Sequence, residues 1–186
     1  MSGWVLQSVV SGVAVPIPRG AETYRMGAVP GEEPIALRPG ERAVVNSGQS
    51  PLGVSFRLNA CSGYLRQFQA FSPSLPLSCP SSSAELPPTI DNLRTYGASC
   101  VDFVRTIPSC TYYLGAFPDD VTPTCRAFVN EALTYNSCVD RHQFDANFKS
   151  RSWRIYLGSQ NELWNDAHDI IRLLDASGRT VDVWSY

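Results

Sequence analysis

The clearest pattern of apolar and polar positions lies near the end of the chain, where two alternating runs flank a polar turn. The runs are Ile170–Leu174 and Thr180–Tyr186, and each can present one apolar face to a core. Between them, Asp175 can open a turn by bonding to its own backbone, and Gly178 can close it where φ is positive. The pattern predicts a β-hairpin.

Similar short runs predict five further strands, at Trp4–Val10, Ile35–Leu37, Arg42–Asn46, Val54–Leu58 and Trp153–Leu157. Pro39 and Gly40 suit the two central positions of a type II turn between the second and third of these strands. The run Val13–Pro18 is extended, but its two prolines confine it to a sheet edge or a loop. The stretch Arg19–Pro34 has no period and is expected to be loop.

The middle of the chain changes to helical spacing. Ser72–Pro88 is rich in Ser and Pro, which indicates a linker or surface loop. Apolar or small residues then recur at helical intervals over Asp91–Thr106. A second helix begins with Thr122 as N-cap and Pro123 at the first helical position. Phe144–Arg151 can add a short third turn. We therefore expect residues 1–71 and 152–186 to form one β-sandwich and residues 72–151 a helical insertion.

Three segments carry a family resemblance. The pattern L-W-N-x-x-x-D-x-I-x-L-x-D-x-x-G-x-x-V-D runs from Leu163 to Asp182, Ser-Gly-Trp ends at Trp4, and L-x-P-G-x-x-x-V-V begins at Leu37. Together these segments resemble lamin-tail domains over a little over half of the chain. The positions that carry the resemblance are Trp4, Pro39, Gly40, Trp164, Asp169, Asp175, Gly178 and Asp182. The resemblance implies a mainly β, immunoglobulin-like sandwich and a non-catalytic binding or scaffolding module, here with an inserted disulfide-bonded helical hairpin.

The resemblance also implies a free sheet edge. Lamin-tail domains normally begin with a strand before the Gly-Trp segment, and here only Met1 and Ser2 precede Gly3 and Trp4. A missing strand would leave the N–H and C=O groups of the first strand unpaired. We therefore expect strand pairing at this N-terminal edge, with an upstream segment or with a second copy.

Overall composition narrows the classes of partner. The 186 residues are 44% hydrophobic and have a formal net charge of −2, as in an ordinary globular protein. No apolar run approaches the ~20 residues of a membrane-spanning helix. A charge of −2 gives no help in holding a phosphate backbone, which argues against nucleic acid as a partner.

Six cysteines predict three disulfides, and therefore an oxidising compartment. There is no C-x-x-C pair, and Cys138 with His142 would supply only half of a tetrahedral zinc site. If Cys100 and Cys110 lie on one helix, and Cys125 and Cys138 on the next, an antiparallel hairpin favours two bonds between them. The favoured pairing is Cys110–Cys125, Cys100–Cys138 and Cys61–Cys79, out of about 15 connectivities.

Because the N-terminus has neither a basic nor an apolar signal region, we expect a mature domain or fragment of an exported protein, either extracellular, cell-surface or periplasmic.

Candidate catalytic chemistry is sparse. Asp166, His168 and Asp169 form a polar loop that could act as an acid–base cluster, although Asp at such a position usually satisfies turn backbone groups. These aspartates with Asp175 and Asp182 could be imagined as calcium ligands, but they lack the spacing of a dedicated calcium loop. The four tryptophans, at positions 4, 153, 164 and 184, are expected in the core.

The sequence therefore assigns no catalytic, cofactor-binding or metal-binding residue. It favours a binding or scaffolding module of an exported protein, whose partner is a protein or a component of the cell envelope. One alternative is an accessory or catalytic part of a secreted hydrolase, with its site around Asp166, His168 and Asp169. A second alternative is nucleic-acid binding, by analogy to nuclear lamin tails.

Overall fold

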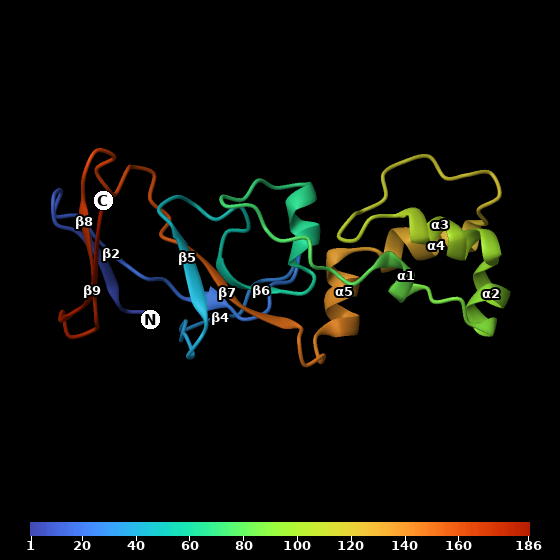
Figure 1. Cartoon of the computed structure of the whole chain (residues 1–186), viewed down its shortest axis with the longest axis horizontal. Coiled ribbons are helices and arrows are strands. Elements are labelled where there is room, and N and C mark those ends of the chain that lie inside the picture. The colour runs from blue at the N-terminus through green and yellow to red at the C-terminus, as the bar shows by residue number, and fades with distance from the viewer. The chain divides into compact units, whose positions relative to one another are not determined.

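A computed structural model describes the whole chain, Met1–Tyr186, which forms two compact units (Figure 1). The sheet unit comprises Met1–Tyr24, Ala28–Leu58 and Ser150–Tyr186. The helical unit comprises Arg25–Gly27 and Asn59–Lys149. Residues 59–71, which the sequence groups with the strands, belong to the helical unit.

The sheet unit contains a four-stranded antiparallel sheet in the order β2-β1-β8-β9. Its strands are β1 (Val5–Ser8), β2 (Ala14–Pro16), β8 (Ile170–Leu174) and β9 (Thr180–Ser185). The predicted hairpin is confirmed as β8–β9. Asp175 Oδ1 accepts from the backbone N–H groups of Ser177 at 2.9 Å and Arg179 at 3.0 Å, and Gly178 has φ +76°. The turn residues act as their chemistry predicts.

The first strand is not an open edge, so the expected pairing there is wrong. Strand β1 lies between β2 and β8, with Leu6 opposite both Val15 and Leu173. The physical reason is that the chain turns back directly after β1, and β2 covers the edge from within. Pro16 is tolerated because β2 is itself the outermost strand.

The second sheet has five strands in the order β4-β3-β6-β7-β5. Its strands are β3 (Gly20–Ala21), β4 (Glu32–Glu33), β5 (Arg42–Asn46), β6 (Ser55–Asn59) and β7 (Lys149–Tyr156). The β3–β6 and β5–β7 pairs are parallel. Strands β3 and β4 fall within Arg19–Pro34, which was expected to be loop, and β7 begins within the segment expected to form a third helical turn.

The Pro39-Gly40 turn forms, but it does not join two strands. Glu41 N–H donates to Arg38 O at 2.9 Å, and Gly40 has φ +80°. The strand expected at Ile35–Leu37 is absent because Ile35 bonds elsewhere: its carbonyl accepts from Ser2 N–H, and its own N–H donates to Ser2 Oγ. Hydrogen bonds between Ile35 and Ser2 thus replace the strand pairing that a hairpin would have provided.

The two sheets share one apolar core. Its fully buried members are Ile17, Ile35, Trp153 and Ile155. Side chains of both sheets pack against them, including Leu173 of β8 and Ala43 of β5. The sheet unit is therefore a two-sheet structure with its apolar faces turned inward.

The helical unit has five α-helices and one 3₁₀ helix. They are η1 (Ser62–Gln67), α1 (Ser82–Glu85), α2 (Ile90–Tyr96), α3 (Ala98–Thr106), α4 (Pro123–Ala132) and α5 (Tyr135–His142). Thr122 caps α4 through its side chain, as predicted, with Pro123 at the first position. The long helix expected over Asp91–Thr106 is broken at Gly97, whose φ of +86° and ψ of 158° lie outside the helical region.

All six cysteines are bonded, but the favoured pairing is wrong. The bonds are Cys61–Cys138, Cys79–Cys110 and Cys100–Cys125. The helical hairpin assumed for the pairing does not exist, because Cys110 follows the end of α3 and Cys138 lies on the separate helix α5. Helices α3 and α4 instead join through Cys100 and Cys125, both buried among apolar side chains.

The longest helix, α4, has 10 residues, and no helix is both long and apolar enough to cross a membrane.

Candidate functional site

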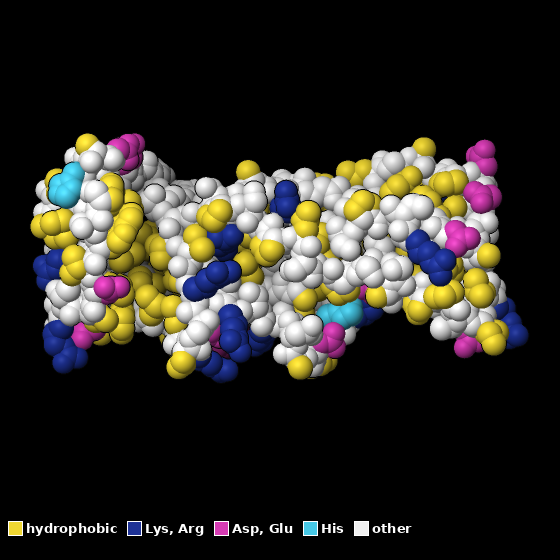
Figure 2. Space-filling model, in the orientation of Figure 1, with side chains coloured by type: hydrophobic (Ala, Val, Ile, Leu, Met, Phe, Trp, Pro, Cys, Tyr) yellow, Lys and Arg dark blue, Asp and Glu magenta, His cyan; other side chains and the backbone are white.

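An apolar groove opens between the two sheets of the sheet unit. Strand β9 ends one sheet and β5 ends the other, and residues of both line the groove. Its volume is about 660 Å³, within the ~300–1,000 Å³ typical of small-molecule sites. The aliphatic part of the lining comprises Leu6, Ile17, Leu37, Ala43, Val45, Ile171, Leu173 and Val183. Figure 2 shows hydrophobic side chains gathered in the hollow between the β8–β9 side and the β5 side.

Aromatic side chains form part of the groove's wall. Trp184 and Tyr186 project from the end of the chain with their ring centroids 4.8 Å apart, and Trp164 also lines the groove. Trp184 is 61% exposed. Tyr186 is held in place because its hydroxyl donates to Asn165 O at 2.8 Å. The expectation that every tryptophan lies in the core is therefore wrong for Trp184, whereas Trp153 is fully buried.

Asp182 supplies the one charged side chain of the lining. Its Oδ1 accepts from the backbone N–H of Val183 at 2.9 Å, and it forms no ion pair. A carboxylate in an otherwise apolar wall favours a ligand that brings a cation or a hydrogen-bond donor. The sequence suggested Asp182 only as one member of a calcium ligand set and placed Trp184 in the core, because alternation along β9 does not reveal what faces the strand.

Asp169, one member of the predicted acid–base cluster, has a structural role. This residue is fully buried, and its carboxylate accepts from Ser8 Oγ and from the N–H groups of Asn165 and Ile170 at 2.7–3.0 Å. Burial alone would raise the pKa of Asp169, but these hydrogen bonds hold it below its ordinary value. Asp169 thus ties β1 to the start of β8, as a capping residue would.

His168 and Asp166 lie on the exposed loop beside it. His168 Nδ1 donates to the backbone oxygen of Tyr186 at 2.6 Å, which orients the ring along the end of the chain. Neither His168, Asp166 nor Asp169 lines the groove. The calcium ligand set is likewise divided, because Asp175 serves the hairpin turn and Asp182 serves Val183.

In the helical unit, His142 lies among charged side chains, and Cys138 offers no free thiol for a shared zinc site because it is bonded to Cys61. His142 Nε2 lies 3.0 Å from Glu85 Oε1, and its Nδ1 lies 2.7 Å from Asp145 Oδ2. Arg141 Nε pairs with the other Glu85 oxygen at 2.7 Å. Burial alone would lower the pKa of His142, but the bonds to Asp145 and Glu85 raise it above its ordinary value.

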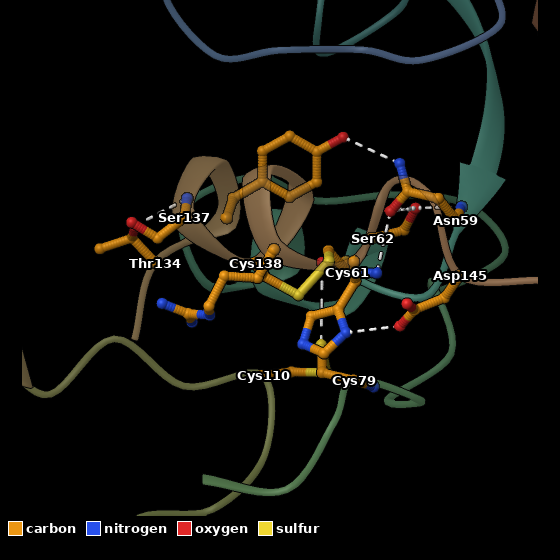
Figure 3. Close-up of a disulfide and its surroundings, with 12 residues drawn as sticks. Asn59, Cys61, Ser62, Cys79, Cys110, Thr134, Ser137, Cys138 and Asp145 are labelled. Atoms are coloured by element: carbon orange, nitrogen blue, oxygen red, sulfur yellow. Dashed lines mark hydrogen bonds and ion pairs between the residues drawn. A yellow bond between two sulfur atoms is a disulfide. The ribbon is translucent and has the colours of Figure 1, made fainter. Parts of the chain in front are cut away.

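Asp145 of this charged cluster lies near the Cys61–Cys138 disulfide in Figure 3. There Asn59 Oδ1 accepts from Cys61 N–H at 2.9 Å, and Asn59 Nδ2 donates to Tyr135 OH at 3.1 Å. Burial, with the Glu85 carboxylate nearby, raises the pKa of Tyr64 to about 12. The ion pairs of Glu85 in α1 with Arg141 and His142 in α5 favour a structural role for this cluster.

Comparisons with known proteins identify no relative: no protein-family model, no curated protein and no solved structure matches the chain.

Proposed function

We propose that this chain is a non-catalytic binding or scaffolding module, and that its ligand site is the apolar groove between β9 and β5. The observation that carries the proposal is the groove itself, which leaves Trp184 largely exposed beside aliphatic side chains of two sheets. Exposed apolar surface of this kind usually marks an interaction site.

The partner proposed is a protein or a component of the cell envelope. The three disulfides support folding in an oxidising compartment, and we propose an extracellular, cell-surface or periplasmic location. Membership of the lamin-tail family is also a proposal. The hairpin and the Pro-Gly turn support it, as does the packing of two sheets on one core, whereas the two parallel strand pairs depart from a purely antiparallel sandwich.

The alternatives have less support. A hydrolytic site at Asp169 would need a carboxylate free to exchange protons, and this one is buried with its oxygens already bonded. Nucleic-acid binding at the groove would need cationic side chains, and the one charged side chain of the lining is the carboxylate of Asp182.

Titration with the neutral fluorescent dye Nile red tests the proposal. The wild type should bind the dye at one saturable site. Trp184→Ala should weaken binding by about 1–2 kcal/mol, a factor of roughly five to thirty, without lowering the melting temperature.

Phe144→Ala is the matched control, because Phe144 is an aromatic side chain 89% exposed in the helical unit. The proposal fails if the wild type shows no saturable binding, or if Trp184→Ala and Phe144→Ala have the same effect.

A further inference from the structure

We propose that the groove's natural occupant is an extended peptide that adds as a strand to the free edge of β9. This inference rests on the proposed function and narrows it to one class of ligand. It further assigns the peptide a pattern: apolar side chains at alternate positions and one Lys or Arg opposite Asp182.

The backbone of β9 offers the pairing groups. Strand β9 is the last in its sheet, so one of its sides has no neighbour. Tyr186 N–H donates to Asp169 O, which makes this pair a hydrogen-bonded one. Because hydrogen-bonded and non-bonded pairs alternate along an antiparallel ladder, Trp184 and Asp182 face β8, whereas Val183 and Ser185 direct their N–H and C=O groups outward.

Exposed apolar side chains lie on both faces of this edge. Val181 and Val183 are each about half exposed, at 51% and 52%, and Trp184 is 61% exposed on the groove side. An added strand would cover these residues, and its own alternate side chains would enter the groove beside Trp184. Main-chain bonds would then supply affinity, and the groove would select the side chains.

Asp182 determines the charge of the partner. Its carboxylate occupies the outward N–H of Val183, the position that the carbonyl of an added strand would take. In the unbound chain this hydrogen bond makes the edge less available for pairing with another strand. A Lys or Arg on the incoming strand would draw the carboxylate across as a cross-strand ion pair and release the N–H for the peptide carbonyl.

The charge of Asp182 also distinguishes a foreign peptide from a second copy of the chain, and β9 from the edge strand β5. A second copy would pair through its own β9, which brings another Asp182 and no Lys or Arg to form the cross-strand ion pair. The edge strand β5 carries the exposed Arg42 and would repel a cationic peptide. A foreign strand bearing a cation therefore fits β9 better than β5.

Selection of phage-displayed random dodecapeptides on the intact wild-type protein tests this inference. Enriched sequences should alternate apolar and polar residues and contain one Lys or Arg. A selected peptide, made synthetically, should lose at least tenfold in affinity when the amides that face β9 are N-methylated, because N-methylation removes the pairing N–H. N-methylation at the intervening amides should have little effect.

Replacing the peptide's cation with norleucine should weaken binding by about fivefold to the wild type, and hardly at all to Asp182→Asn.

Four results would overturn the inference. Strand addition would be excluded if the library yielded no enriched peptide, or if both N-methylation patterns reduced the affinity equally. If the same protein still bound Nile red at a saturable site, the proposed apolar site would be retained. A dimer in sedimentation that a selected peptide does not dissociate would show that a second copy occupies the edge. An equal effect of norleucine on both proteins would remove Asp182 as the determinant. Loss of Nile red binding as well would instead mean that the proposed function is wrong.

Discussion

Gly63 provides the sharpest test of the packing, because an added methyl group there would enter a disulfide. The residue lies in η1, and a Cβ built on it overlaps Cys110 Sγ and comes within 2.9 Å of Pro76 O. Neither atom can swing aside, since Sγ is bonded to Cys79 and the oxygen belongs to the backbone. Gly63→Ala must therefore displace η1 or break the bond.

The magnitude follows from opposing terms. Ala in place of Gly in an open helix would stabilise by about 1 kcal/mol. Overpacking of a fixed interior typically costs about 1–3 kcal/mol. If the Cys79–Cys110 bond fails to form, the loss of a closure across 31 residues costs roughly 3–4 kcal/mol in the chain-entropy model. We expect a net loss of about 2 kcal/mol or more, opposite in sign to the helix-propensity effect.

Denaturant unfolding measures the loss of stability, and thiol titration shows whether the Cys79–Cys110 bond has formed. Gly48→Ala is the matched control, because a Cβ at Gly48 meets nothing within 4 Å and its φ lies outside the left-handed region. If Gly63→Ala is as stable as Gly48→Ala and has no free thiol, the close approach of η1 to this disulfide is refuted.

Three further predictions concern buried charge. Arg57→Met should lower the free energy of unfolding by about 3–5 kcal/mol in chemical denaturation, because it leaves the buried Glu41 carboxylate, 2.5 Å from Arg57 Nη2, without its cation. Adding Glu41→Gln should restore most of this loss, and strictly additive losses would contradict the pairing. The raised pKa of His142 means that its protonated form stabilises the fold fully below pH 6.5, and that this contribution is lost as pH rises through the folded value. Melting temperatures should therefore fall over this interval in the wild type but not in His142→Gln, and parallel curves would disprove the effect. The lowered pKa of Asp169 predicts stability that is present above pH 3.8 and lost as pH falls through the folded value, so Asp169→Asn should unfold with a shallower acid limb; an unchanged limb would count against it.

The sequence by itself determined the features that depend on a few neighbouring residues. Asp175 and Gly178 predicted the β8–β9 turn, because their bonds close within the turn itself. Thr122 and Pro123 predicted the start of α4 for the same reason. Asp169 could be recognised as a capping residue, since two of its donors lie within four positions of it. Interactions of this kind can be predicted because their partners are close together in the sequence.

Only the tertiary structure decided the features that depend on distant segments. Alternation along β1 and β9 marks both as strands but cannot show that β1 is covered on both sides while β9 is left at an edge. Cysteine spacing could not give the Cys61–Cys138 bond, because it joins residues 77 positions apart that are brought together by the fold of the helical unit. Trp184 resembles a core residue in sequence, yet it remains exposed because no strand lies beyond β9. An alternating strand has the same pattern whether or not another strand pairs with it, so the groove could be recognised only once both sheets were placed.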